Sequence, residues 1–285
     1  MKNIYKCIVV VFIMLVSTIV KADNWMYSLE DAKKLAVATN KLILVDFWAS
    51  WCGPCKKMDE ESWSNDEIKQ IMKNYVSLQI DIDIDKELAR KYNVQGIPYI
   101  FILDPNGEVV YQQMSYMNKN QVKNLLEKYS LNTSFLQRDY LIYNKNKNSN
   151  SSFRLAVSYQ NYSIYLDENV RNDFLDLSIN YLNQTKNLLK SEKKKNIVMN
   201  QKIQLIQIHE KLIRGDYKKC RKELDKSFEE GKIDERNKGL YYFLNYVACK
   251  GQENDDLSEI WLDKLKSTPN HTTYLKRAEI LLGQS

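Results

Sequence analysis

Hydrophobic positions along residues 28–129 alternate between helical and strand-like spacing. A helical pattern over 29–39 follows a cap at Ser28 and leads into the almost unbroken apolar run 42–48. After a cap at 64–66, the sequence predicts a helix carrying Ile68, Ile71 and Met72. The next patterns predict strand, helix and strand over 76–84, 85–92 and 99–103. After the turn at 104–107 come a returning strand over 108–114 and a helix from Asn118 to about 129. This order predicts a small α/β domain over residues 23–130, with helices flanking a mixed central sheet.

The pattern changes after residue 130. The sequence of residues 131–152 predicts a connecting helix over 133–143. It then predicts a flexible loop over 144–152, which is rich in Asn, Ser and Lys. Strand signals are nearly absent beyond that point. Helical spacing recurs over about 153–166, 170–190, 197–214, 217–229, 235–250, 257–266 and 272–282. We expect an all-α domain of helical hairpins over residues 153–285.

Two glycines suggest a repeat in the helical part. Gly215 and Gly251 lie thirty-six residues apart, close to the thirty-four of tetratricopeptide repeats, and small residues such as Ala156 and Ala248 fit packing positions. The helical part therefore resembles a tetratricopeptide-like array. Such arrays present a groove to a peptide or partner protein, so one expectation is a client protein on the helical domain. The alternative is a helical cap that only packs on the first domain.

The first twenty-two residues have the layout of a secretory signal. Lys2 and Lys6 precede an apolar run of about fourteen residues, and Val20-Lys21-Ala22 offers small or branched residues at the −3 and −1 positions. The run is shorter than a membrane-spanning helix, so an uncleaved anchor is the alternative. Cys7 precedes the apolar core, which argues against a lipoprotein. We expect a signal peptide over 1–22, cleaved near Ala22, and an exported, periplasmic protein whose dithiols are under oxidative pressure.

The candidate chemistry lies at Trp51-Cys52-Gly53-Pro54-Cys55, directly after the apolar run. A thiolate is the attacking species in disulfide exchange, and a helix N-terminus stabilises it. A helix that begins at Cys52 therefore makes Cys52 the nucleophile. The two-residue spacer places Cys55 one turn further on, where it resolves the mixed disulfide.

Asp46 is the one carboxylate inside the apolar run 42–48. The ordinary interpretation is an acid at a strand end that faces water. The functional interpretation, which we favour, is a buried proton acceptor for Cys55 whose pKa is raised by desolvation.

A CxxC pair can also be half of a zinc site or an inert structural disulfide. The other candidate ligands are not in a paired spacing: Cys220, Cys249, His209 and His271. We therefore expect no metal and no cofactor. Cys220 and Cys249 lie on neighbouring predicted helices, where they form either a second disulfide, which we favour, or two buried thiols. The two histidines receive no role.

Two segments resemble a known family. Val45-Asp46-Phe47-Trp48-Ala49-Ser50-Trp51-Cys52-Gly53-Pro54-Cys55-Lys56 resembles the active-site segment of thioredoxin, and Gly96-Ile97-Pro98 resembles the loop whose proline is cis and faces the disulfide. The resemblance covers about residues 25 to 130, and 57–66 is closer to exported thioredoxin-like proteins. One departure stands out. The lysine that partners the buried aspartate in cytosolic thioredoxin falls near Ser77 or Gln79, which carry no positive charge.

The resemblance implies a thiol-disulfide oxidoreductase that acts on protein thiols and disulfides. Catalysis would involve Cys52, Cys55, Asp46 and Pro98, and substrate contacts would come from Trp51, Gly53, Pro54 and Ile97. The Gly-Pro spacer resembles that of thioredoxin, which has a reducing potential near −270 mV. We therefore expect a reductase supplied by a membrane-bound electron donor.

Two alternatives remain for the function. One is a disulfide oxidase or isomerase, and the other is a helical scaffold whose redox site only modulates client binding. The formal charge of +6 includes lysines of the N-terminal segment and is otherwise dispersed, so we expect no nucleic-acid partner.

Overall fold

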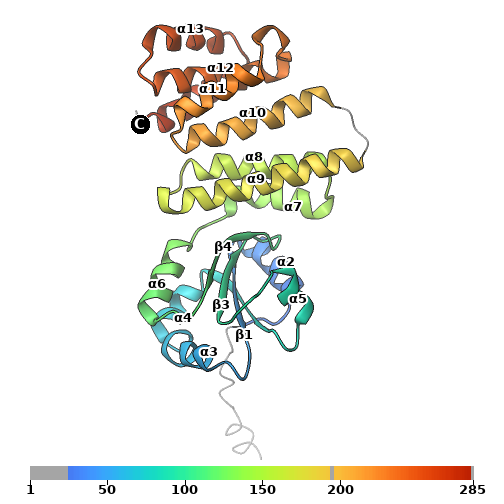
Figure 1. The fold of residues 1–285 in the computed structure, drawn as a ribbon, viewed down its shortest axis with the longest axis vertical. Coiled ribbons are helices and arrows are strands. Elements are labelled where there is room, and N and C mark those ends of the chain that lie inside the picture. Colours follow the sequence, from blue (N-terminus) through green and yellow to red (C-terminus); the bar gives the residue numbers. More distant parts are fainter. Residues whose placement is uncertain (1–24, 193–195, 284–285) are drawn as a thin grey trace, which may run out of the picture.

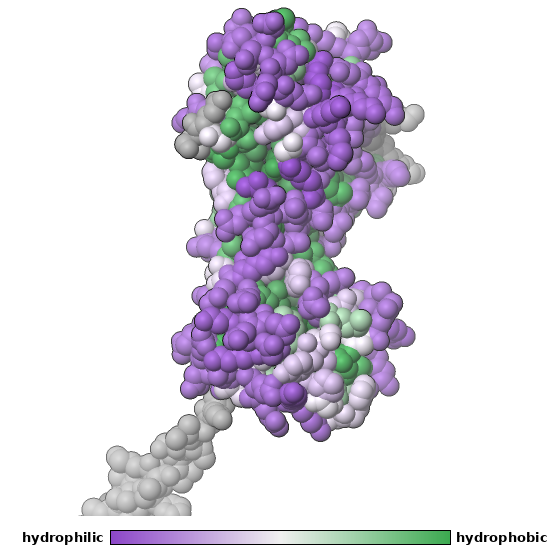
Figure 2. Space-filling view, turned by 60° about the vertical axis from the view of Figure 1, so that its left-hand side comes forward, coloured by the Kyte–Doolittle hydropathy of each residue, from purple (hydrophilic) through white to green (hydrophobic). Residues whose placement is uncertain are grey.

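The computed structural model describes residues 25–192 and 196–283. An α/β part is followed along the long axis by a stack of helices (Figure 1). Polar residues cover most of the face shown in Figure 2, and hydrophobic residues emerge between them in both parts. The succession of an α/β part and an all-helical part confirms the predicted fold class (Figure 1). The expected signal peptide, residues 1–22, lies outside the described residues.

A mixed four-stranded sheet occupies the centre of the α/β part within the described residues. β1 (Leu42–Trp48) pairs in parallel with β2 (Tyr75–Asp81) and antiparallel with β3 (Tyr99–Leu103). β4 (Val109–Met114) pairs antiparallel with β3, which gives the order β2-β1-β3-β4. β1 therefore lies inside the sheet, as its unbroken apolar run predicts.

β2 is shorter than the predicted strand over residues 76–84. The carboxylate of Asp81 accepts the backbone N–H of Asp83 at 2.9 Å, which bends the chain into a turn. Alternating Asp and Ile residues imitate a strand here, although they belong to the turn that follows one.

Helices cover both faces of the sheet. They are α2 (Leu29–Thr39), α3 (Gly53–Met58), a π-helix (Asp59–Trp63), α4 (Asp66–Met72), α5 (Lys86–Lys91) and α6 (Lys119–Lys128). Ile43, Val45 and Phe47 of β1 pack in the core that includes α2. Leu42 and Leu44 belong to the opposite core, with residues of α3, α4 and α6. Since side chains alternate along a strand, Asp46 belongs to this second face.

The remainder of the described chain is helical. A short 3-10 turn (Ser134–Leu136) precedes α7 (Gln137–Lys145), α8 (Ser149–Ser163), α9 (Glu168–Ser191), α10 (Ile197–Ile213), α11 (Tyr217–Ser227), a 3-10 turn (Glu230–Lys232), α12 (Glu235–Lys250), α13 (Asp255–Lys266) and α14 (His271–Leu281). Consecutive helices pack as neighbours, most extensively α8 with α9 and α12 with α13. The predicted helices are confirmed with boundaries shifted by a few residues.

The structure corrects the prediction of a flexible loop over residues 144–152. Residues from Ser149 onward form the first turn of α8, which Asn148 caps through its side chain. The hydroxyl of Ser152 donates to the Tyr181 carbonyl at 2.9 Å, and that of Ser149 donates to Glu192 at 2.8 Å. Polar composition suggests a loop, but these serines are buried and hydrogen-bonded to α9 and the residue that follows it.

The favoured second disulfide is also absent. Cys220 of α11 and Cys249 of α12 are both free and buried. Burial raises the pKa of the Cys220 thiol to about 12, so this thiol stays protonated and unreactive at neutral pH.

The two glycines that suggested a repeat play different structural roles. Gly215 adopts a left-handed conformation with φ +79° between α10 and α11. Gly251 has an ordinary φ of −69°, but a Cβ atom there would lie 2.6 Å from the Tyr217 ring. Gly215 therefore permits a turn, whereas Gly251 permits close packing.

The two parts meet at the turn between β3 and β4. Asp104 in this turn is fully buried. Its Oδ1 atom accepts the backbone N–H groups of Asn106 and Glu108, at 2.8 and 2.9 Å. Its Oδ2 atom accepts the hydroxyls of Tyr159 in α8 and Tyr181 in α9, at 2.8 and 2.5 Å. One carboxylate thus connects the sheet to the first helical hairpin.

Burial raises the pKa of Asp104 to about 6, although the hydroxyl and backbone donors oppose this shift. Because the folded-state pKa lies above the ordinary value of 3.8, the folded protein binds this proton more tightly than the unfolded chain. This residue therefore contributes a loss of stability as the pH rises from about 4 to about 6.

We expect Asp104→Ala to lower the free energy of unfolding by about 3 kcal/mol at pH 7, because two buried tyrosine hydroxyls lose their acceptor. Urea-induced unfolding measures the change. Asp104→Asn is the matched control and should be at least as stable as the wild type at pH 7, since its remaining oxygen still accepts the N–H groups of the turn and it carries no buried charge. Equal stability of Asp104→Ala and the wild type would show that the connection contributes nothing.

Candidate active site

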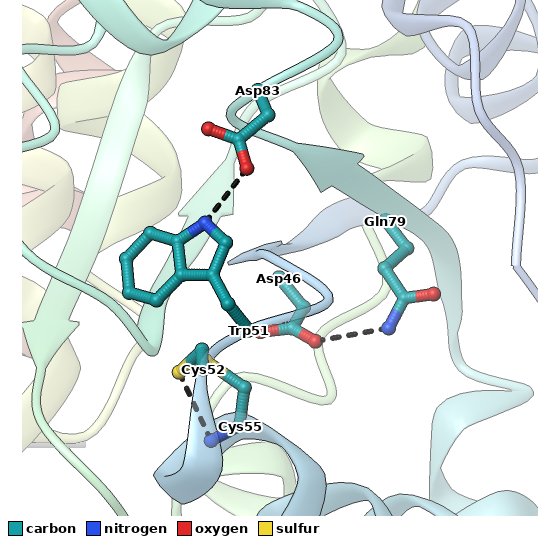
Figure 3. Close-up of a disulfide and its surroundings, with 6 residues drawn as sticks. All are labelled: Asp46, Trp51, Cys52, Cys55, Gln79 and Asp83. Carbon is teal, nitrogen blue, oxygen red and sulfur yellow. Dashed lines mark hydrogen bonds between the residues drawn. A yellow bond between two sulfur atoms is a disulfide. The ribbon is translucent and has the colours of Figure 1, made fainter.

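The cysteine pair forms a disulfide between the end of β1 and the start of α3 (Figure 3). The sulfur atoms are 2.05 Å apart, and Cys52 and Cys55 are only 3% and 6% exposed. Cys52 is the N-cap of α3, and its Sγ accepts the backbone N–H of Cys55 at 3.2 Å. The first cysteine thus lies where the sequence predicts the helix to begin.

The position of Cys52 favours a negatively charged sulfur once the disulfide is reduced. The first N–H groups of a helix have no partner within the helix, and the helix dipole is positive at this end. α3 continues without interruption through Asp59 into the π-helix. Pro54 lies in the first turn, where its missing N–H costs no helical hydrogen bond. The arrangement stabilises a thiolate at position 52 once the disulfide is reduced, and a thiolate is the nucleophile in disulfide exchange.

Asp46 is buried on the face of the sheet that packs against α3, α4 and α6, with 3% of its surface exposed. Gln79 of β2 is its direct partner in the strand register, and Gln79 Nε2 donates to Asp46 Oδ2 at 3.2 Å (Figure 3). Ser77 pairs with Leu44 instead. The place that the resemblance assigns to a lysine is therefore taken by a neutral amide, which stabilises a carboxylate less than a cation would.

Burial raises the pKa of Asp46 to about 7, and the nearby charge of Asp59 acts in the same direction. Hydrogen bonds from Gln79 and Trp63 oppose the shift. A carboxyl group that titrates near neutral pH can accept a proton and return it under ordinary conditions. This property suits an acceptor for the proton of the second cysteine.

The loop before β3 packs against the disulfide. The Ile97-Pro98 peptide bond is cis, and the half-buried Ile97 side chain joins a small cluster with Ala49 and both cysteines. The carbonyl of Pro98 accepts the backbone N–H of Ser115 at 3.0 Å, which ties this loop to the chain after β4.

Exposed residues surround the buried disulfide. Trp51 is 65% exposed, and Gly53 and Pro54 are exposed beside it. The indole Nε1 of Trp51 donates to Asp83 Oδ2 at 2.7 Å, which fixes the ring (Figure 3). Asp83 has no sequence signal as a site residue beyond being an acid in the segment predicted to be a strand.

No cluster of three or more His, Cys, Asp or Glu side chains suited to a metal is found among the described residues. The sequence-predicted residues of the α/β part are brought together around one disulfide. Cys220, Cys249, His209 and His271 lie in the helical part, away from it. The fold and the site define a thioredoxin-like protein-disulfide oxidoreductase.

Comparison with known proteins supports this class. A family model described as a thioredoxin-like domain matches residues 29–130. Thioredoxin from Bacillus subtilis (strain 168) is 34% identical over 112 residues, which are 39% of this chain and 97% of that protein. Thioredoxin from Mycoplasmoides gallisepticum is 31% identical over 91 residues, which are 32% of this chain and 87% of that protein. Through this domain the chain belongs to the thioredoxin family, and it is a thiol-disulfide oxidoreductase.

We expect Asp46→Asn to remove the pH dependence that this buried acid imposes. The shift of its pKa from 3.8 to about 7 corresponds to roughly 4 kcal/mol lost on ionisation. Because the folded-state pKa is raised, this loss develops between about pH 4 and pH 7. The oxidised variant should therefore match the wild type at pH 4 and be more stable at pH 8, as measured by urea-induced unfolding.

The same substitution should slow disulfide exchange at pH 7, since the proton of Cys55 loses its acceptor. Insulin reduction measures this rate. Asp66→Asn is the control, because it removes a fully exposed acid of α4 and leaves Asp46 and the contacts of Trp51 in place. Persistence of the wild-type stability profile between pH 4 and pH 8 in Asp46→Asn would contradict the assignment.

Proposed function

We propose that the protein is exported and reduces protein disulfides through the Cys52-Cys55 dithiol. The observation that carries the proposal is the pair itself, held at a helix N-terminus with Gly53-Pro54 between the sulfur atoms. This spacer is the one found in thioredoxin, whose potential lies near −270 mV. Export is supported by the signal-like layout of residues 1–22.

The reaction proceeds in two exchanges. The Cys52 thiolate attacks a substrate disulfide, a mixed disulfide forms, and one substrate sulfur leaves as a thiolate that takes up a proton. Cys55 then transfers its proton to the Asp46 carboxylate, directly or through water, and attacks Cys52 Sγ. The second substrate thiol is released. The substrate gains two electrons, the protein pair becomes a disulfide, and a membrane-bound donor restores the dithiol.

Substrate binding uses the surface around the disulfide. An extended segment of the substrate pairs with the backbone of Ile97, and Pro98 keeps competing thiols or metals from the sulfur atoms. Trp51, Gly53 and Pro54 form the exposed rim that the segment meets. This arrangement contacts the backbone of the substrate more than its side chains, so it suits many protein substrates.

The helical part is proposed to be tetratricopeptide-like and to hold a client protein. Its support is the succession of packed helix pairs, from α8 and α9 to α12 and α13. In the scaffold alternative this binding is the main function. None of the helices within residues 25–192 and 196–283 is long and apolar enough to cross a membrane.

The redox potential tests the direction. Equilibration of the intact protein with glutathione buffers should give a value for Cys52-Cys55 near −270 mV. A value above about −180 mV would identify an oxidase or isomerase instead. A variant with Cys220→Ala and Cys249→Ala, without residues 1–22 and hence without Cys7, is the control, because only the active-site pair can titrate in it.

Trapping in the native host tests the substrates and export together. Cys55→Ser should accumulate mixed disulfides on Cys52, because the resolving thiol is lost, whereas the double variant Cys52→Ser, Cys55→Ser should accumulate none. The trapped protein should begin near residue 23 on N-terminal sequencing. A mature protein that retains residues 1–22 would contradict cleavage. Complete chains serve better than truncation after residue 130, which would expose the interface at Asp104.

A further inference from the structure

A cavity of about 320 Å³ lies in the helical part, lined by residues of α7, α8, α10, α12 and α14. Phe153, Val157, Ile206, Leu240 and Tyr274 provide its apolar walls. The helical part adjoins the sheet at the β3–β4 turn, and the disulfide lies at the opposite end of β1 (Figure 1). The cavity is therefore separate from the redox site.

The cavity contains a buried hydrogen-bond acceptor without a partner. His209 is 2% exposed, and its Nδ1 lies 2.8 Å from Gln160 Oε1. Gln160 Nε2 donates to the Ile206 carbonyl at 2.9 Å, so Oε1 is the acceptor and Nδ1 carries the proton. Burial and the charge of Arg277 lower the pKa of His209 to about 3, which keeps the ring neutral. Its Nε2 is then an acceptor, and no described residue bonds to it.

Positive charge gathers at the same cavity. Arg154 pairs with Asp139 at 2.8 Å, which accounts for the one acid in the lining. Lys202 and Arg277 also line the cavity, and within the described residues neither forms an ion pair with a carboxylate. The Lys202 ammonium instead lies 5.9 Å from the centre of the Phe153 ring. Two cations thus remain available to an anionic group.

The apolar wall is built by close packing of α12 and α14. A Cβ atom at Gly239 would lie 3.2 Å from the Tyr274 ring, so the missing side chain lets this ring approach α12. Tyr274 is followed one turn later by Arg277 on the same helix. The aromatic surface and the positive charge are therefore adjacent.

We propose that this cavity binds a short peptide segment in which an acidic group neighbours an aromatic or branched apolar side chain. The apolar side chain occupies the space beside Phe153 and Tyr274. A peptide N–H donates to His209 Nε2, and the carboxylate meets Lys202 and Arg277. This binding site rests on the proposed client-binding function of the helical part, and it does not depend on the direction of the redox reaction.

A peptide fits these groups better than a small inorganic anion. Phosphate or sulfate would satisfy the cations, but it would leave the apolar walls uncovered and would offer a poor donor to a neutral imidazole nitrogen. A peptide supplies an apolar side chain, an N–H donor and a carboxylate within a few bonds of one another.

A randomised heptapeptide library tests the proposal on the intact chain carrying Cys52→Ser and Cys55→Ser, in which no covalent capture occurs. The bound fraction should be enriched in Asp or Glu next to Phe, Tyr or Leu. Arg277→Glu should weaken binding of the enriched heptapeptide by about tenfold or more in fluorescence anisotropy. Lys276→Glu is the matched control, an exposed change of equal charge on the same helix, and should stay within about twofold.

Two further measurements complete the test. An amidated form of the same heptapeptide distinguishes a terminal carboxylate, whose removal would abolish binding, from an acidic side chain, for which binding would persist. The ¹⁵N resonance of His209 Nε2 should shift when the heptapeptide is added. Absence of an acidic-apolar consensus, equal binding by Arg277→Glu, or an unchanged resonance would each overturn the proposal. Insulin reduction by the wild-type chain tests the redox proposal separately.

Discussion

The burial of β1 on both faces is the constraint on which the α/β part depends. Its alternate side chains fill two separate cores, and its end delivers the chain to the N-terminus of α3 at Cys52. The same burial determines the chemistry of Asp46. A carboxylate in this strand is removed from water, and the neutral Gln79 beside it compensates only in part. One strand therefore positions the disulfide and raises the pKa of Asp46, the proposed proton acceptor for Cys55.

Local patterns predicted the elements well, because they depend on neighbouring residues. The run Leu42–Trp48 is the observed strand, and Asn118 caps α6 as its sequence suggests. Asp46 was predicted to be a buried proton acceptor from its place in an apolar run just ahead of the cysteine pair. Features that depend on distant partners were missed. Asp104 reads only as a turn residue, since the tyrosines that bind it lie 55 and 77 positions further along the chain.

The same limit explains the other errors. Ser149 and Ser152 look like loop residues until α9 supplies the packing that buries them. Cys220 and Cys249 occupy neighbouring helices, but adjacency of helices does not fix the separation or direction of two sulfur atoms. His209 carries no signal in the sequence, because its tautomer follows from Gln160, forty-nine positions away. The periodicity of apolar residues identifies the buried face of a helix or strand, whereas hydrogen-bond partners distant in sequence can be identified only from the folded structure.

Docking through Asp104 places the helices at the end of the sheet away from the disulfide, so they leave the site open to protein substrates. This geometry constrains any client of the helical part. One short segment does not reach both the cavity and the disulfide of the same molecule, because the cavity lies among the helices and the disulfide lies at the end of β1 away from the β3–β4 turn. The bound segment and the reacting disulfide must then belong to well-separated regions of the client. Binding of a client to the helical part would raise the local concentration of the substrate near the disulfide. It would not select for the sequence around the cysteines of the substrate.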